Sequence, residues 1–199
     1  MTSTETSGPD WRECRIALPS SENWLVLDLG TEQPEVWARS VVEERLGTGA
    51  PSARSEVIIE NVLWYWASAV QQQALCAALL VPSDGSVIAS CSVRELRVPP
   101  EALTLEALRV EAEQAAGPCF GQPEISEIQL PLGPALRVHR REPSAPESDS
   151  GAVVEGVAHY ILPRAYPAVL ECRLLWGSLG LGEELARMAD DLAGSVRLV

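Results

Sequence analysis

The stretch LRVHRRE, residues 136–142, places basic or titratable side chains at alternate positions. On a strand, Arg137, His139 and Arg141 would share one face, because successive side chains of a strand point to opposite faces. Such a stripe on an acidic chain could bind a carboxylate-rich protein partner or an anionic ligand. It could equally pair with the protein's own acids, including those of the loop that follows, or remain solvated. We favour internal pairing or solvation.

Cys119 is the second candidate, because it stands in the Gly/Pro-rich segment GPCFGQP, where a thiol could be accessible. A cysteine nucleophile needs a neighbouring base, and the chain offers two histidines, His139 and His159. No pattern brings either histidine beside Cys119, so we expect a passive thiol. His159 shares a predicted strand face with apolar residues, and we expect it to be packed and hydrogen-bonded. Because cysteines and histidines form no close ligand pairs, we expect no metal ion and no other cofactor.

The segment GSLGLGEEL places Gly177, Gly180 and Gly182 between a predicted strand and a predicted helix. A phosphate group can bind at a helix N-terminus, where backbone N–H groups are free. The spacing GxxGxG, however, matches neither a dinucleotide-binding loop nor a Walker loop. Glu183 and Glu184 would put negative charge where the phosphate would lie, whereas they complement the helix dipole. We therefore interpret the glycines as a structural turn.

The elements that position these residues are predicted from hydrophobic periodicity and turn residues. Alternation and β-branched residues predict strands in residues 11–19, 23–29, 126–142 (two short strands), 152–163 and 168–177. Helical spacing and capping residues predict helices in residues 34–47, 55–73, 104–118 (with Thr104 as the cap) and 182–196. A β-hairpin that turns at Asp84-Gly85 is predicted for residues 74–98.

The apolar stretch VLWYWASAVQQQALCAALLV, residues 62–81, has the length of a membrane span. Gln71, Gln72 and Gln73 interrupt it near the middle, which disfavours burial in a bilayer. Apolar residues before the glutamines recur at helical spacing, whereas the run after them ends at Pro82 before a turn. We interpret the stretch as the end of a helix followed by a strand.

The composition argues against several classes of partner. The 199-residue chain has a net charge of −13, and all 15 basic residues are arginines. Nucleic-acid binding needs a cationic surface, and anionic lipid attracts basic segments, so we expect neither nucleic acid nor a membrane as partner. The five cysteines are widely spaced and form no CxxC motif. This pattern indicates free thiols in a reducing compartment, and therefore a cytoplasmic protein.

Residues 11–199 are predicted to form one α+β domain, with an antiparallel sheet flanked by helices as an α/β/α sandwich. The strands come mostly as consecutive hairpins, which is typical of antiparallel sheets. Residues 1–10 contain no basic residue and no apolar run, so we expect a disordered lead-in rather than a signal peptide. The polar, Pro/Ser-rich segment at about 142–151 is predicted to be a mobile loop.

The order of elements resembles the Mog/PsbP-like fold, and especially its actinobacterial members related to the lipoprotein LpqN. The resemblance is carried by an opening strand that ends at Leu18-Pro19, by Trp24 at the start of the second strand, and by a closing strand followed by LARMADDLAGSVRLV. It spans nearly the whole chain and implies a binding or accessory domain without a catalytic site. It assigns no functional residue here. Unlike the lipoprotein members, this sequence shows no secretion signal and no N-terminal lipidation cysteine.

We therefore predict a non-enzymatic, cytoplasmic protein-interaction or accessory domain that could belong to a larger assembly or form a homo-oligomer. Among its six tryptophans, one or two could anchor the protein partner. The alternative is a small-molecule-binding or hydrolytic enzyme with a pocket between sheet and helices. A histidine within hydrogen-bond reach of Cys119 would favour that enzyme. So would a dense group of ionisable side chains at the base of a deep hollow.

Overall fold

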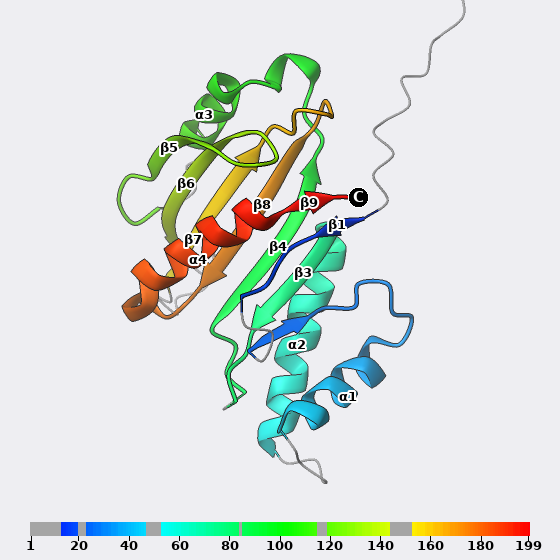
Figure 1. Ribbon diagram of the computed structural model, residues 1–199. Helices are drawn as coiled ribbons and strands as arrows, with labels where there is room; N and C mark the ends of the chain where they lie inside the picture. Colours follow the sequence, from blue (N-terminus) through cyan, green and yellow to red (C-terminus); the bar gives the residue numbers. More distant parts are fainter. Residues whose placement is uncertain (1–12, 20–22, 47–52, 84, 115–118, 144–152) are drawn as a thin grey trace, which may run out of the picture.

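A seven-stranded antiparallel sheet, in the order β2-β3-β4-β8-β7-β6-β5, forms the centre of the molecule (Figure 1). The computed structural model describes residues 13–19, 23–46, 53–83, 85–114, 119–143 and 153–199. The strands of this sheet are β2 (Trp24–Val26), β3 (Ala74–Leu80), β4 (Ala89–Leu96), β5 (Glu124–Gln129), β6 (Pro134–Pro143), β7 (Val153–Ile161) and β8 (Val169–Trp176). The hairpins β3-β4, β5-β6 and β7-β8 follow the sequence order, and β4 pairs with β8 in the middle. The predicted α+β fold with an antiparallel sheet is confirmed.

Helices cover both faces of this sheet (Figure 1). On one face, α1 (Pro34–Leu46) and α2 (Ala53–Gln71) pack over β2 and β3, where Leu79 is fully buried. On the same face, α3 (Leu105–Gln114) packs over β6. On the opposite face, α4 (Gly182–Ser195) packs over β7 and β8. Each helix thus buries its apolar stripe against the sheet.

Two of the predicted local signals, a helix cap and a turn, can be compared with the described residues. The Thr104 hydroxyl oxygen accepts a hydrogen bond from the Ala107 N–H at 3.1 Å and caps α3. Gly85, between β3 and β4, has a φ of +79°, and its N–H donates to the Pro82 carbonyl at 2.8 Å. Glycine adopts such a positive φ without the steric cost that other residues have, so the predicted turn is confirmed at this position. Asp84, the other residue of the predicted turn, lies outside the described residues.

The apolar stretch 62–81 is divided between two elements, as predicted. The helix α2 ends at Gln71, and β3 begins at Ala74. Gln73 lies between them with a φ of +54°, so the backbone leaves the helical conformation at the glutamines. Within the described part of the chain, no helix has both the length and the apolar character needed to cross a membrane.

The expectation that neighbouring strands form hairpins is wrong at the N-terminus. The strand β1 is limited to Cys14–Arg15, and it pairs with β9 (Arg197–Leu198) at the other end of the chain. The strand β2 pairs with β3 instead. The β1/β9 ribbon lies on the α4 side of the sheet, where Ile16 packs against the core (Figure 1). The sequence analysis missed β9 because two residues are too few to show a strand period.

Several predicted features lie outside the described residues. They include the lead-in at 1–10 and the helix end at Gly117-Pro118. The predicted loop at about 142–151 needs a correction at its start, since β6 continues to Pro143. Glu142 pairs with Val154 of β7, so the cross-strand ladder extends further than the polar composition indicated. Residues 144–152 are outside the description.

Candidate functional site

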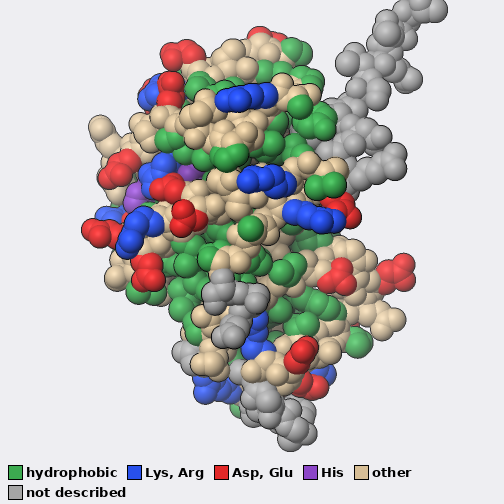
Figure 2. Space-filling model, viewed as in Figure 1, with side chains coloured by type: hydrophobic (Ala, Val, Ile, Leu, Met, Phe, Trp, Pro, Cys, Tyr) green, Lys and Arg blue, Asp and Glu red, His purple; other side chains and the backbone are tan. Residues whose placement is uncertain are grey.

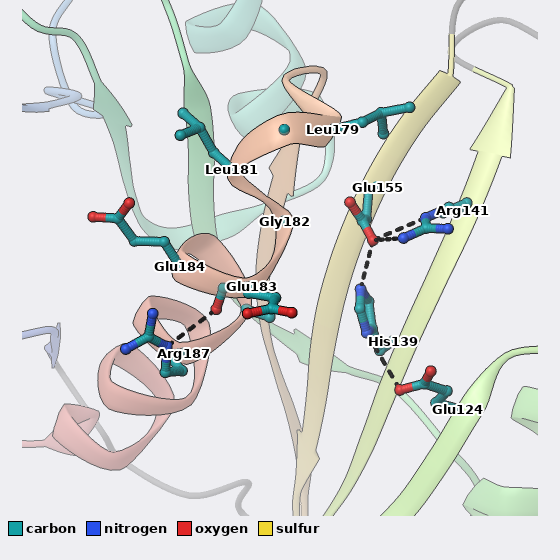
Figure 3. A pocket seen from close by; sticks show the side chains of 12 residues that line it. Glu124, His139, Arg141, Glu155, Leu179, Leu181, Gly182, Glu183, Glu184 and Arg187 are labelled. Carbon is teal, nitrogen blue, oxygen red and sulfur yellow. Dashed lines mark hydrogen bonds and ion pairs between the residues drawn. The ribbon is translucent and has the colours of Figure 1, made fainter.

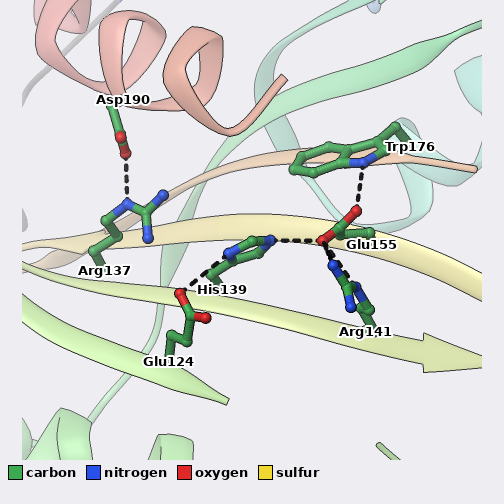
Figure 4. A network of polar contacts seen from close by, with 7 residues as sticks. All are labelled: Glu124, Arg137, His139, Arg141, Glu155, Trp176 and Asp190. Carbon is green, nitrogen blue, oxygen red and sulfur yellow. Dashed lines mark hydrogen bonds and ion pairs between the residues drawn. The ribbon is translucent and has the colours of Figure 1, made fainter. Parts of the chain in front are cut away.

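The residues of the predicted stripe all lie on β6 and share the face that α4 covers (Figure 4). The register of β6 against β7 places Arg141 directly opposite Glu155. Each stripe residue contacts an acid of this same chain: Arg137 contacts Asp190, whereas His139 and Arg141 contact Glu155. The sequence analysis favoured internal pairing or solvation, and the geometry shows internal pairing. The acids come from β7 and α4 rather than from the loop after β6. We name the following set the charge network: Arg137, His139, Arg141, Glu155, His159, Trp176 and Asp190.

Glu155 is the centre of the charge network, and its side chain is only 1% exposed. Its Oε1 accepts hydrogen bonds from His139 Nε2 at 3.0 Å and from Arg141 Nε at 2.9 Å. Its Oε2 accepts a hydrogen bond from the Trp176 indole N–H at 3.1 Å. His139 must carry its proton on Nε2, because an ionised carboxylate only accepts. A buried carboxylate is tolerated when charge-assisted hydrogen bonds replace its water shell, and these donors provide them.

These donors also determine the ionisation of Glu155. Burial raises the pKa of Glu155, but the hydrogen bonds from Arg141, Trp176 and His139 outweigh burial and hold that pKa below its usual range. The side chain therefore stays ionised at neutral pH. It acts as a fixed negative charge that orients its neighbours, and it does not supply a proton as a general acid would.

The first residue of α4, Gly182, lies against this carboxylate. A Cβ atom at Gly182 would be 2.7 Å from Glu155 Oε2, so a side chain does not fit unless the carboxylate moves. The free N–H groups and the positive dipole end of a helix N-terminus favour an adjacent carboxylate. This contact explains the glycine at the end of the turn η2 (Leu179–Leu181). The anion at the start of this helix is the protein's own carboxylate, in agreement with the structural interpretation of the GSLGLGEEL segment.

Asp190 of α4 is the second acid of the charge network. Its Oδ1 accepts hydrogen bonds from Arg137 Nε at 2.7 Å and from His159 Nε2 at 2.9 Å. Burial raises the pKa of Asp190, but the bonds from His159 and Arg137 outweigh it and lower that pKa overall. His159 is fully buried, and within the described residues its Nδ1 has no hydrogen-bond partner. The prediction that His159 is packed and hydrogen-bonded is confirmed, with Nε2 as the donor.

A hollow of about 920 Å³ opens beside the charge network, between the start of α4 and strands β5 to β7 (Figure 3). Among the described residues that line the hollow, the ionisable ones are Glu124, Glu155, Glu183, Glu184, Arg141, Arg187 and His139. Glu124 is 80% exposed, and its Oε2 lies 3.6 Å from His139 Nδ1. Acidic, basic and histidine side chains gather over this end of α4 on the left of Figure 2. The lining carries more glutamates than arginines, so the hollow is not suited to an anionic ligand.

Ionisable groups therefore gather at a hollow, which the sequence analysis named as a sign of an enzyme. The buried carboxylate among them, Glu155, already accepts hydrogen bonds from three donors of this chain. The described lining also contains no serine, threonine or cysteine that could act as a nucleophile. Two chemical uses remain for this arrangement. The hollow can receive a cationic group, or His139 Nδ1 can orient a water molecule while Glu155 fixes the other ring nitrogen.

Cys119 lies at a different place on the surface. The thiol is half-buried and lines a hollow of about 650 Å³ together with Arg109 and Glu113. The described residues that line this hollow include neither histidine. The geometry thus provides no histidine base for Cys119 there, and the interpretation as a passive thiol stays a prediction.

The tryptophans divide into buried and exposed residues. Trp24 and Trp176 belong to the core, and Trp66 donates its indole N–H to the Asp28 carbonyl at 2.8 Å. Trp64 of α2 is 65% exposed and makes an edge-on ring contact with Tyr65. As expected for adjacent aromatic residues on a helix, they cannot all face the sheet.

The sequence analysis missed Glu155, Asp190 and Trp176 as members of this site. Glu155 carried a detectable signal, because it is the one acid in the apolar segment AVVEGVAHYI. A charge within a strand that is apolar on both faces needs partners, and basic residues on a neighbouring strand can provide them. Asp190 offered no comparable signal, since it is one of two adjacent aspartates on an amphipathic helix.

The described residues contain no group of three or more histidine, cysteine, aspartate or glutamate side chains arranged to hold a metal ion. No protein-family model, curated protein or solved structure matches this chain. The resemblance to the Mog/PsbP-like fold and its LpqN-related members therefore stays a prediction. The geometry of the site is the basis for the function considered below.

Proposed function

We propose that this protein is a non-enzymatic protein-interaction or accessory domain that receives a basic segment of a protein partner in the hollow at the start of α4. One observation carries the proposal. The hollow has an excess of acidic side chains at its rim, while the buried carboxylate beneath it, Glu155, is already satisfied by donors of this chain.

The charge at the rim favours a cationic partner. Glu124, Glu183 and Glu184 are exposed, and the side chains of the two glutamates on α4 form no ion pair with any described residue. Of the arginines nearby, Arg141 is engaged with Glu155, and Arg187 donates to a backbone carbonyl of α4. The net charge of −13 adds a long-range attraction for a basic protein, which raises the rate of encounter.

Apolar side chains at the same rim indicate what else the partner segment contains. Leu179 is 48% exposed and Leu181 is 39% exposed, and both line the hollow. Interfaces combine apolar contact area with complementary charge. The segment that fits therefore carries arginine or lysine side chains beside at least one apolar side chain.

A matched pair of double variants tests this surface. A synthetic peptide of alternating arginine and leucine serves as the probe, and isothermal titration calorimetry measures its affinity. Changing Glu183→Gln and Glu184→Gln should weaken binding about tenfold, since two charge contacts are lost. The control changes Glu43→Gln and Glu44→Gln, which are adjacent exposed glutamates on α1 and give the same change in net charge. Equal weakening in both variants would show nonspecific attraction and would contradict the proposal.

The same variants identify the natural partner. An affinity pull-down from the native host, followed by mass spectrometry, should recover basic proteins with wild type and with the α1 control. Those proteins should be lost with the Glu183/Glu184 variant. Size-exclusion chromatography with light scattering then shows whether the domain also forms a homo-oligomer or joins a larger assembly. We place this function in the cytoplasm, which is supported by the free thiols among the described residues.

A second candidate function is hydrolysis of a small substrate by a water molecule held at His139. It is favoured by one observation, the fixation of His139 Nε2 by a buried carboxylate beside a hollow. Turnover of a panel of activated nitrophenyl esters should then be lost in His139→Gln and kept in Cys119→Ser. Absence of turnover above the buffer rate with wild type would exclude this function for the ester class.

A further inference from the structure

Four cysteines converge on the α4 side of the sheet, although they are far apart in the sequence. They are Cys14 of β1, Cys76 of β3, Cys91 of β4 and Cys172 of β8. Cys91 and Cys172 are buried, whereas Cys14 and Cys76 are only half-buried. Cys14 and Cys76 pack against the same apolar cluster, which contains Val93. The sequence analysis predicted free thiols and brought no two of them together.

Cys14 and Cys76 form the close pair. Their Sγ atoms lie 3.8 Å apart, across a sequence separation of 62 residues. Cys14 belongs to a strand of only two residues, which the backbone hydrogen bonds between Glu13 and Val199 hold against β9. Cys76 lies on β3 where the pairing with β4 shifts register, between Ala74 and Cys76. A disulfide needs an S–S distance of about 2.05 Å, which small side-chain movements in these irregular segments can reach.

The two thiols also differ in acidity. Donation from the Cys76 thiol lowers the pKa of Cys14 although burial opposes it, and the same contact and burial raise the pKa of Cys76. A thiolate is the nucleophilic form of cysteine, and the Cys76 thiol donates toward Cys14 Sγ, so this contact favours Cys14 as the attacking thiol.

We propose that Cys14 and Cys76 are a redox pair that a peroxide converts to an intramolecular disulfide. The Cys14 thiolate attacks one peroxide oxygen, the O–O bond breaks, and protonation of the other oxygen releases water or an alcohol. The resulting sulfenic acid is then attacked by the sulfur of Cys76, which loses its proton, and the S–O bond breaks to release water. Two thiols are thereby oxidised to one disulfide, and one peroxide is reduced.

The disulfide would join the β1/β9 ribbon to the seven-stranded sheet. The ribbon is otherwise held to that sheet by side-chain packing, including that of Ile16 and Leu198. The other thiols are less suited to this reaction. Donation involving Cys91, together with burial, raises the pKa of the fully buried Cys172. Cys119 lines a hollow whose described lining contains no second cysteine.

Oxidation of the purified full chain with hydrogen peroxide tests the pair directly. Peptide mapping without reductant should recover a linked peptide that contains Cys14 and Cys76, and thiol titration should show the loss of two thiols per molecule. Wild type should gain roughly 5–15 °C in melting temperature on oxidation, because the bridge closes a long loop. Dithiothreitol should reverse both changes.

Variants distinguish this pair from general oxidation. Cys119→Ser should still form the bridge, whereas Cys14→Ser and Cys76→Ser should each abolish the gain in melting temperature. The peptide map of wild type decides the matter even where a variant folds poorly. Oxidised wild type that carries only over-oxidised cysteines, intermolecular bridges or a bridge between other cysteines would overturn the proposal.

Discussion

Two buried layers of this protein are built on opposite principles. Between α1, α2 and the sheet, the interior is an apolar layer in which side chains such as Val62 and Leu79 are fully buried. Between α4 and strands β6 and β7, the interior contains the charge network around Glu155. Packing in the apolar layer is nondirectional. The charge network has a buried centre at Glu155, but its Arg141 and Asp190 side chains reach the surface, and it depends on particular donors and acceptors.

The difference predicts how each layer tolerates change. An apolar layer loses stability in proportion to the volume removed, and its neighbours relax in part. Removing a buried member of a charge network is costly, because the groups that it bonded lose their partner. The apolar layer is therefore expected to be insensitive to pH, and the charge network to be sensitive to it.

The largest expected effect is that of Glu155→Ala. The change leaves Arg141, His139 and the Trp176 N–H without their acceptor, and we expect a loss of about 3–5 kcal/mol in the free energy of unfolding. Urea denaturation followed by tryptophan fluorescence measures it. Glu155→Gln keeps the shape and one acceptor, so its loss should be smaller. A loss below about 1 kcal/mol for the alanine variant would contradict the dependence of the network on this one carboxylate.

The matching change in the apolar layer is Leu79→Ala. Leu79 is fully buried, and its truncation should cost about 2–5 kcal/mol, as is typical of leucine in a packed core. The loss should have the same size at pH 7 and at pH 5, because Leu79 packs in an apolar cluster whose one phenol, Tyr65, has a pKa raised by burial and stays protonated at both pH values. Urea denaturation at both pH values is the measurement. A loss that changes with pH would remove the contrast between the two layers.

The same contrast explains how far the sequence could predict the structure. Helices, hairpins and the apolar layer follow from periodicity, because each side chain needs only an apolar neighbour of some kind. The stripe of Arg137, His139 and Arg141 was also predicted, since alternation on one strand is a local property. Its acceptors Glu155 and Asp190 were not, because only the strand register and the placement of α4 bring them into contact. The β1/β9 ribbon escaped prediction for the same reason, as it joins the two ends of the chain.

The next effect is the loss of stability in acid. The pKa values of Glu155 and Asp190 are lowered in the folded protein, because donor hydrogen bonds outweigh burial at both sites. A carboxylate whose folded pKa is depressed contributes stability above its unfolded pKa, and that contribution is lost as the pH falls through the folded pKa. These two carboxyl groups should therefore contribute no change in stability between about pH 7 and pH 5, and stability should decline as the pH falls below about 4.5.

Thermal melts of wild type, Glu155→Gln and Leu79→Ala across this pH range distinguish the contributions of the two layers to the pH dependence of stability. Below about pH 4.5, the slope of melting temperature against pH should be shallower in Glu155→Gln, because this variant lacks one carboxyl group whose pKa is lowered on folding. The slope should be unchanged in Leu79→Ala. Identical slopes in wild type and Glu155→Gln would mean that other carboxyl groups cause the acid loss.

The smallest effects concern two glycines of α4, and here the expected signs are opposite. Alanine is favoured over glycine within a helix by about 1 kcal/mol. Gly194 has open space where a Cβ atom would lie, so Gly194→Ala should stabilise the protein by up to about that amount.

At Gly182 the added methyl group would meet Glu155 Oε2 at 2.7 Å. Because three hydrogen bonds hold this carboxylate, Gly182→Ala should instead destabilise the protein by about 1–2 kcal/mol. Urea denaturation of the two variants side by side measures both signs. Stabilisation by both alanines would show that the carboxylate can move, and that the charge network is as adaptable as the apolar layer.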